Sequence, residues 1–449
     1  MSVETSHEAI SQVMFGWDPL WVSTILFVVT YVVIVTERVN RAIIAGLGAS
    51  LMIAVGVLNQ EQALAGVDFN TLGLLTGMMV LVAITRRCGV FQFVAIWAAK
   101  KVEARPWGIL LMLSVVTAAF SAFLDNVTTV LLIAPITLLI TEELEVSPYP
   151  YLFAEIFASN IGGAATLIGD PPNIMIGSAV GLTFNDFLAN LGPITPLILL
   201  VTLTVIYFIW GRHLTATDEA RARILEFRER DAITDTRLMK QSLSVLAIVI
   251  VGFIFAHPLR LEPATIAMFG AGVLLFLTNL GRDAEEQTED VQRSFGEVEW
   301  VTIFFFVGLF IVVAGIEHAG LLEILAGKVI SATDGDMTVT ALLILWVSAI
   351  ASTIVDNIPF VATMIPLIES MAPTFGGSEN LEPLWWSLAL GACLGGNGSL
   401  VGASANLIVA GFAERAGHRI KFLQFMLLAF PLMLLSIVIA TVYIYLRYL

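Results

Sequence analysis

Three aspartates of this 449-residue chain lie inside long apolar segments. Asp125 stands in SAFLDNVTTVLLIAPI, Asp356 in STIVDNIPFVATMIPLI and Asp170 in IGGAATLIGDPPN. A carboxylate in such a segment costs much free energy unless it faces a cavity or a partner. These aspartates therefore indicate a site that binds an ion, a proton or a polar solute.

Residues that start helices follow two of the aspartates. Asp125 precedes Asn126 and Thr128, and Asp356 precedes Asn357. Asp and Asn are good helix N-caps, so capping alone is one explanation of both aspartates. We favour the other explanation, that they cap a helix and also bind substrate or protons.

Asp170 opens the sequence Asp-Pro-Pro-Asn, which interrupts an apolar segment near its middle. Two adjacent prolines lack amide donors and prevent a continuous helix. Backbone that is irregular at membrane depth is tolerated only where it lines protein or water. We therefore expect Asp170 at the N-terminus of a second half-helix, with Thr166 and Asn173 close by.

The chain contains an internal repeat. The two Asp-Asn pairs stand 231 residues apart, and IGGAATLIGDPPN (161–173) matches LGGNGSLVGASAN (394–406) at an offset of 233. Asn406 takes the place of Asn173, but the second copy has neither the carboxylate nor the prolines. The predicted site is therefore asymmetric.

The composition places these residues in a membrane. Hydrophobic residues make up 58% of the chain and charged residues 13%, against roughly a quarter charged in soluble domains. The net charge of −15 argues against nucleic-acid binding. Two cysteines make neither a disulfide framework nor a four-ligand zinc site, and the chain has no GxxxxGK[ST] motif for ATP.

The apolar segments also predict a topology. They fall at about 19–36, 42–58, 70–85, 107–141, 151–188, 192–211, 242–258, 263–280, 299–316, 339–370, 384–412 and 423–446. With both termini outside, 19 of the 22 Lys and Arg face the cytoplasm, in accordance with the positive-inside rule. The N-terminal stretch 1–12 lacks the basic region of a cleavable signal, so the first segment is expected to remain as an anchor.

This topology requires 107–141 and 339–370 to enter and leave the membrane on one side, as re-entrant helical hairpins. We predict an all-α polytopic membrane protein with about ten transmembrane helices. It has two inverted repeats, 1–211 and 241–449, joined by a cytoplasmic linker, 212–240. Each repeat also has a broken helix, over 151–188 and 384–412, and an interfacial helix, over 88–104 and 319–332.

The segments SNIGGAATLIGDPPNIMIG and FLDNVTTVLLIAP resemble the ion transporter superfamily, in particular the arsenical pump membrane protein, the sodium/proton antiporter NhaD and the melanosomal P protein. The resemblance covers roughly 69–190 and 298–430. It implies ten spans, two re-entrant hairpins and a substrate site between hairpin tips and broken helices. The implied site residues are Asp125, Asn126, Thr128, Asp170, Asn173, Asp356, Asn357 and Asn406.

The surroundings of the site limit its substrate. No Lys or Arg occurs between 106 and 211, and only Lys328 occurs between 299 and 413. Such a site suits protons, cations or a neutral polyhydroxy solute. We predict proton-coupled efflux of arsenite and antimonite from the bacterial cytoplasm, with Na⁺/H⁺ antiport as the alternative. A dicarboxylate carrier is disfavoured, because the related carriers have a Ser-Asn-Thr tip where this chain has Asp-Asn-Val-Thr.

Other functional classes fit less well. An intramembrane aspartyl hydrolase would carry Gly-x-Gly-Asp, where this chain has Leu-Ile-Gly-Asp, so no enzyme and no cofactor are expected. A channel has no local sequence signature that separates it from a transporter. The expected partners are the solute, protons and the lipid of a bacterial inner membrane. The sequence does not decide whether the protein forms a homodimer or whether a cytosolic ATPase docks on 212–240 and 281–297.

Overall fold

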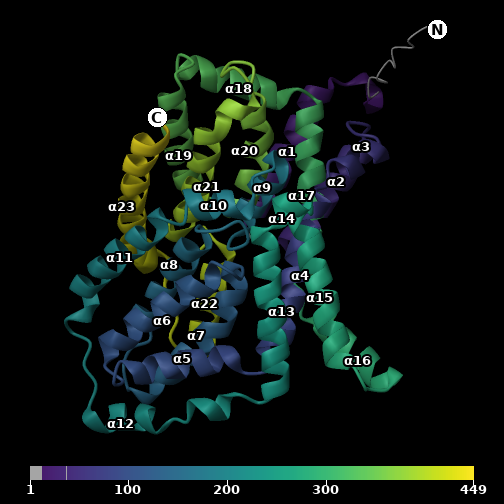
Figure 1. Ribbon diagram of the computed structural model, residues 1–449. Coiled ribbons are helices and arrows are strands. Elements are labelled where there is room, and N and C mark those ends of the chain that lie inside the picture. The colour runs from purple at the N-terminus through teal and green to yellow at the C-terminus, as the bar shows by residue number, and fades with distance from the viewer. Residues whose placement is uncertain (1–12, 37) are drawn as a thin grey trace. The chain divides into compact units, whose positions relative to one another are not determined.

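The computed structural model describes residues 13–36 and 38–449, which form helices and connecting turns without a strand among them (Figure 1). The N-terminal stretch 1–12, which precedes the first predicted membrane segment, lies outside the described residues. Seven described helices are long and apolar enough to span a membrane, and five apolar helices of 10–17 residues accompany them. The predicted class of polytopic α-helical membrane protein is confirmed.

The chain divides into two compact units, which we describe separately. The first comprises Met1–Phe69, Trp300–Gly335 and Ala362–Ser378. Its helices are α1 (Pro19–Val35), α2 (Arg41–Ala54), α3 (Gln60–Ala65), α17 (Trp300–His318) and α18 (Leu321–Ala332), with the short turn η1 (Met14–Gly16). In this unit α2 packs along α17, and the Tyr31 hydroxyl lies 2.8 Å from that of Thr363.

The second unit comprises Asn70–Glu299, Asp336–Val361 and Glu379–Leu449. Its helices up to residue 299 are α4 (Phe69–Arg86), α5 (Val90–Lys101), α6 (Pro106–Ser121), α7 (Asn126–Glu143), α8 (Tyr149–Gly163), α9 (Pro171–Val180), α10 (Phe184–Asn190), α11 (Ile194–Ile206), η2 (Tyr207–Gly211), α12 (Asp218–Glu226), η3 (Glu229–Ala232), α13 (Thr236–Ile254), α14 (Ala256–Leu259), α15 (Pro263–Asn279) and α16 (Ala284–Gly296). The later ones are α19 (Met337–Ile354), the start of α20 (Asn357–Glu369), α21 (Glu382–Gly395), η5 (Gly396–Gly398), α22 (Ser404–Arg415) and α23 (Phe422–Tyr448), after the turn η4 (Ser378–Leu381).

The helices predicted for the hairpin arms and for the broken helices are present in both copies of the repeat. The helices α6 and α7 form the hairpin predicted over 107–141, and α8 and α9 are the halves of the helix predicted over 151–188. Their counterparts are α19 with α20, and α21 with α22, where η5 follows the first half-helix. In each copy the first hairpin arm packs on the first half-helix, α6 on α8 and α19 on α21.

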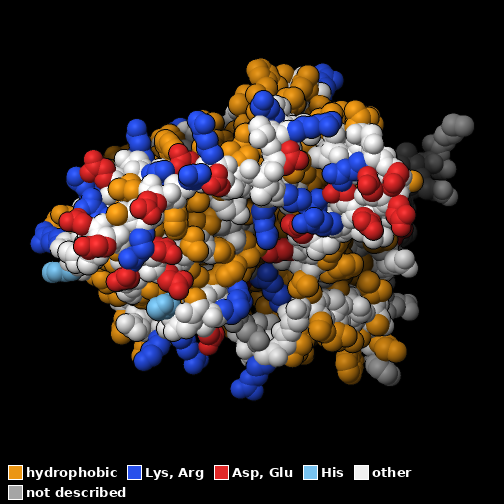
Figure 2. Space-filling model, turned by 90° about the horizontal axis from the view of Figure 1, so that it is seen from below, with side chains coloured by type: hydrophobic (Ala, Val, Ile, Leu, Met, Phe, Trp, Pro, Cys, Tyr) orange, Lys and Arg blue, Asp and Glu red, His pale blue; other side chains and the backbone are white. Residues whose placement is uncertain are grey.

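The two copies run in opposite directions. We call the end of the second unit that α5, α12 and α16 form the charged end; Figure 2 shows Lys, Arg, Asp and Glu side chains gathered on this face. In the first copy, the first residues of α6 and of α8 lie side by side, because the Tyr151 hydroxyl donates to the Pro106 carbonyl at 3.0 Å. By contrast, Trp346 at the middle of α19 donates to Thr441 in the last third of α23. The start of α23 lies at the other end of that helix, where Phe425 contacts Phe153 of α8.

The linker predicted over 212–240 is partly helical and packs on α5. Lys100 of α5 bonds the Glu229 carboxylate at 2.7 Å, which lowers the pKa of that carboxyl below its usual value. Gly89, which precedes α5, has a φ of 80°, and Gly320, which precedes α18, has a φ of 82°. Because left-handed backbone favours glycine, these repeat-equivalent residues start both helices predicted over 88–104 and 319–332.

Twinned glycines allow the hairpin arms to approach the broken helices closely. A Cβ on Gly162 of α8 would lie 2.2 Å from the carbonyl oxygen of Ala118 in α6. A Cβ on Gly395 of α21 would lie 2.5 Å from the carbonyl oxygen of Ala349 in α19. The same contact therefore joins arm and half-helix in both copies.

We expect Gly162→Ala and Gly395→Ala each to lower the free energy of unfolding by about 1–3 kcal/mol, because the added methyl group overlaps backbone that cannot move alone. The measurement is thermal unfolding in detergent. Gly272→Ala in α15 is the control, since nothing lies within 4 Å of its added Cβ. Equal unfolding temperatures for all three variants would contradict the close contact.

Candidate functional site

Two buried asparagines satisfy the backbone where the helices break. The Asn173 amide donates to the Thr166 carbonyl at 2.9 Å. In the other copy the Asn406 amide donates to the carbonyls of Ser399 and Gly396, each at 2.8 Å. Both asparagine side chains are inaccessible to solvent. Because unpaired carbonyls are costly in the membrane, these amides stabilise the irregular backbone of the two breaks.

A serine ties each hairpin arm to its broken helix. The Ser121 hydroxyl at the end of α6 donates to the Ser159 carbonyl at 2.6 Å, and the Ser352 hydroxyl donates to the Ala392 carbonyl at 2.7 Å. All four residues are buried. Since the donors and the acceptors are repeat equivalents, the two hairpins are held in the same way.

A second hydroxyl in each copy reaches back from the break to the hairpin. The Thr166 hydroxyl donates to the Ala122 carbonyl, and the Ser399 hydroxyl donates to the Thr353 carbonyl at 2.5 Å. These contacts bring the loop of each break against the tip of its hairpin. Thr166, which the sequence places in the site, thus positions the hairpin tip with its hydroxyl.

The two hairpin aspartates cap helices and also contact hydroxyl groups. Asp125 is the N-cap of α7: one carboxylate oxygen accepts from the Thr128 amide at 2.8 Å and the other from the Thr128 hydroxyl. One oxygen of Asp356 accepts from the Ile358 amide at 3.1 Å, and the other accepts from the Ser404 hydroxyl at 2.7 Å. Capping therefore explains one oxygen of each carboxylate, while the second belongs to the site.

Asp170 differs from both, because it stands at the N-cap position of α9 but accepts no hydrogen bond from that helix. Its two oxygens lie 3.3 and 3.4 Å from the Asn357 amide nitrogen, which comes from the other copy. Asp125 and Asp356 lie within electrostatic range of this carboxylate. Among the described residues, neither Asp125 nor Asp170 forms an ion pair with Lys or Arg.

A buried chain of amides connects the two copies beside the aspartates. Asn126 of α7 donates to Asn160 of α8 at 3.2 Å. Asn160 donates in turn to Asn397 and Asn406, both at 3.0 Å. The structure thus brings Asn126 and Asn406 from different copies into one network.

The sequence reasoning missed Asn160, Asn397, Ser404 and Cys393 as residues of this site. Cys393 is the repeat equivalent of Asn160, and its thiol lies 3.5 Å from Oδ1 of the Asn173 side chain. Both side chains thus contact the asparagine that closes the break of the opposite copy. Following the offset of 233 through position 160 would have found this pair.

Two cavities of the second unit are each lined in part by a residue of the site or of a break. One of about 60 Å³ lies between α4 and α7 and is lined by Thr128, Arg86, Glu297 and Glu299 among others. It has room for about two waters. The other, of about 390 Å³, is lined by Leu167 at the break of the first copy and by residues around α14. The hairpin tip and the break thus each adjoin a cavity.

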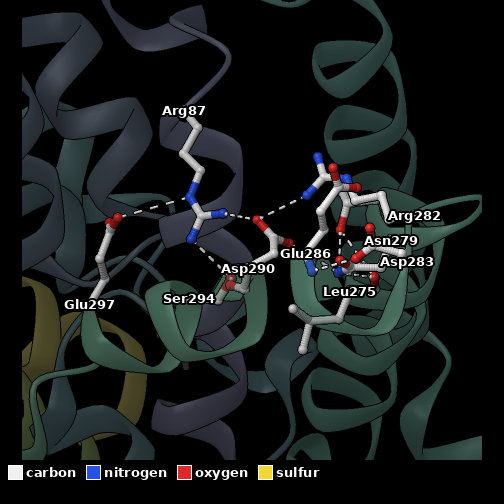
Figure 3. A network of polar contacts seen from close by, with 10 residues as sticks. Arg87, Leu275, Asn279, Arg282, Asp283, Glu286, Asp290, Ser294 and Glu297 are labelled. Atoms are coloured by element: carbon white, nitrogen blue, oxygen red, sulfur yellow. Dashed lines mark hydrogen bonds and ion pairs between the residues drawn. The ribbon is translucent and has the colours of Figure 1, made fainter. Parts of the chain in front are cut away.

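Figure 3 shows a polar network that fixes the end of α4 beside the smaller cavity. Asp290 of α16 accepts from Arg87 at 2.7 Å and from Asn279 at 3.0 Å, and its carboxylate pairs with Arg282 at 3.5 Å. The side chains of Arg87 and Asp290 are only 13% and 12% exposed. Since Glu297 also approaches Arg87, at 3.9 Å, the network includes a residue of the cavity wall.

We expect Asp290→Ala to lower the free energy of unfolding by about 1.5–3 kcal/mol, because the largely buried Arg87 guanidinium loses its principal acceptor. Thermal unfolding in detergent measures the change. Glu289→Ala is the matched control, since this neighbouring side chain is exposed. An Asp290→Ala protein as stable as the control would rule out a structural role for the network.

Asn173→Ala and Asn406→Ala are each expected to cost about 1–3 kcal/mol, because each leaves buried carbonyls without a donor. The midpoint of thermal unfolding reports the loss. Asn185→Ala provides the comparison, because its amide bonds the Ile254 carbonyl at an exposed position. If both buried variants match Asn185→Ala, the two breaks do not depend on these amides.

Comparison with known proteins identifies relatives over nearly the whole chain. The uncharacterized transporter Rv2684 of Mycobacterium tuberculosis is 41% identical and aligns with 95% of this chain and 98% of its own. The 46 kDa membrane protein of Mycobacterium leprae is 42% identical, with 94% and 98% covered. The P protein of Homo sapiens is 33% identical, with 94% of this chain and 59% of the P protein covered.

Solved structures share the fold at low sequence identity. The YdaH transporter of Alcanivorax borkumensis has a TM-score of 0.61 at 14% identity and covers 96% of this chain and 98% of its own. MtrF of Neisseria gonorrhoeae has a TM-score of 0.57 at 11% identity, with 97% and 96% covered. A family model described as citrate transporter matches residues 31–391. The chain therefore belongs to the citrate transporter (CitMHS) family of membrane transporters, within the permease group that includes the P protein.

Proposed function

We propose that this protein is a secondary transporter that exports arsenite or antimonite in exchange for protons by alternating access. The observation that carries the proposal is the set of three aspartates, two of them without a basic partner, beside buried asparagine and hydroxyl groups. Amides and hydroxyls suit a neutral solute with several hydroxyl groups. The carboxylates suit the coupling proton.

The charge of the site disfavours a free carboxylate anion as substrate. Citrate, named in the description of the family, would bring its negative charges to Asp170 and to Asp125, whose hydrogen-bond partners Asn357 and Thr128 are neutral. A helix N-terminus attracts anions, but an aspartate already occupies the N-cap position of both α7 and α9. A proton or a cation lowers the repulsion among these carboxylates.

The inverted repeat supports alternating access, because the same hairpin and break occur in opposite directions. Most basic residues of the second unit belong to the charged end, so the positive-inside rule places that end in the cytoplasm. We accordingly propose a location in a bacterial inner membrane with the C-terminus outside. The cavity at Thr128 then adjoins the cytoplasmic side of the site.

Na⁺/H⁺ antiport is the second candidate. Its support is Asp170, whose carboxylate is not used to cap α9 and approaches only amide and thiol groups among the described residues. Carboxylate and amide oxygens are suitable ligands for a hard cation. In this case the three aspartates form an ion site and no solute other than Na⁺ is required.

Asp125→Asn and Asp356→Asn are expected to abolish proton-coupled transport in proteoliposomes without changing the unfolding temperature, because the amide keeps the shape but cannot exchange a proton. A pH dye inside the vesicles follows the imposed proton gradient as solute is added. Asp218→Asn serves as the control, since its side chain is 94% exposed. Full transport in both hairpin variants would refute the role of the aspartates.

The same vesicles distinguish the substrates, because arsenite, Na⁺ and citrate can be added in turn. Arsenite-dependent dissipation of the gradient without any ATPase supports the main proposal. A response to Na⁺ alone favours the antiporter, and a response to citrate alone contradicts both.

A further inference from the structure

Glu155 is a buried carboxyl group that the proposed function does not use. It lies on α8 and is 1% exposed. One of its oxygens accepts a hydrogen bond from the Thr137 hydroxyl of α7, and the other, Oε2, has no partner among the described residues. A buried polar atom without a partner is unfavourable, so this oxygen calls for an explanation.

Among residues 13–36 and 38–449, no cation contacts this carboxyl group. The elements that pack on α8 are α6, α7, α11, α21, α22, η2, η5 and α23. Their titratable or charged residues are Glu142 and Glu143 of α7, Glu382 and Cys393 of α21, Glu414 and Arg415 of α22, Tyr207 of η2, and Tyr443, Tyr445, Arg447 and Tyr448 of α23; α8 itself carries Tyr149 and Tyr151. None of these residues forms a hydrogen bond or an ion pair with Glu155, whose described hydrogen-bond partner is Thr137.

Glu155 lies between the charged end and the hairpin tip. It is the seventh residue of α8, about 9 Å along the helix from its start at the charged end. Thr137 lies about 16 Å along α7 from Asn126 at the tip. Glu155 and Thr137 thus lie between the surface at the charged end and Asp125 at the hairpin tip.

A row of buried polar side chains on α7 follows this path. Asn126, Thr129, Thr137 and Thr141 are separated by three, eight and four residues, a spacing that places them on one helix face. Each is at most 3% exposed. The Thr129 hydroxyl has no described hydrogen-bond partner, so it is available to a group or a water between Thr137 and the tip.

The pair occurs in one copy of the repeat only. At the equivalent positions the second copy has Leu388 in place of Glu155 and Ile368 in place of Thr137. Contacts that maintain the fold, such as those of the serines and asparagines at the breaks, occur in both copies. The pair of Glu155 and Thr137 therefore occurs only in the copy whose hairpin arms begin and end at the charged end. This restriction indicates a function on that side of the protein.

We propose that Glu155 is a proton-binding residue that transfers protons between the charged end and Asp125 along the polar face of α7. The O–H bond of protonated Asp125 breaks as an O–H bond forms on the Glu155 carboxylate. The same proton later leaves Glu155 for a water molecule at the charged end, which becomes a hydronium ion, and no other bond changes. The transfer role rests on the proposed proton coupling, whereas the binding of a proton by Glu155 does not.

Infrared difference spectra of the full-length protein, recorded while the pH is changed, test proton binding directly. The C=O band of a buried protonated carboxyl group is expected to disappear in Glu155→Gln and to persist in Glu142→Gln, an exposed carboxyl at the end of α7. Thr137→Val is expected to move the band to higher frequency, because the carboxyl group loses its hydrogen bond. An unchanged band in both Glu155→Gln and Thr137→Val would overturn the proposal.

Transport in proteoliposomes tests the transfer role. Glu155→Gln is expected to slow proton movement by about tenfold or more, as the loss of a proton-transfer group does in catalysis, while solute binding at equilibrium stays within about twofold. Wild-type proton flux in Glu155→Gln would overturn the relay. If Asp125→Asn keeps its coupling while the infrared band depends on Glu155, the proposed function fails and the proton site stands.

Discussion

Breaking a helix inside a membrane exposes backbone carbonyl groups that water cannot satisfy. The arrangement of the second unit depends on the side chains that donate hydrogen bonds to these carbonyls. Asn173 and Asn406 supply the missing donors from within their own helices. Once the breaks are stable, their loops can hold the hairpin tips through Thr166 and Ser399. These contacts hold the hairpin aspartates within electrostatic range of Asp170.

Symmetry and chemistry are divided between different residues. The contacts that shape the two copies are twinned, down to the acceptor carbonyls of Ser121 and Ser352. The groups that can exchange a proton are only partly twinned: Asp170 corresponds to Ala403 in the other copy, and Glu155 corresponds to a leucine. A symmetric frame allows the unit to face either side of a membrane, whereas asymmetric acids give the two sides different chemistry.

Much of this arrangement could be predicted from the sequence, because the repeat offset and the prolines determine where helices must stop. Asp125 as a helix cap and the break at Asp170 follow from local rules. The partners could not be predicted, because Asn357 meets Asp170 over 187 positions of the chain and only the fold decides that meeting. Glu155 had a visible signal, a lone carboxyl in an apolar segment, but its meaning depends on Thr137, which belongs to another helix.

The glycine contacts of α8 and α21 have a mechanical consequence. Since Gly162 touches the backbone of Ala118, and Gly395 that of Ala349, the first hairpin arm and the half-helix pack backbone against backbone. Pulling them apart loses the dispersion contacts of this close packing, so motion of each pair as one body is favoured. A change of access that keeps these contacts carries the aspartates together with their supports.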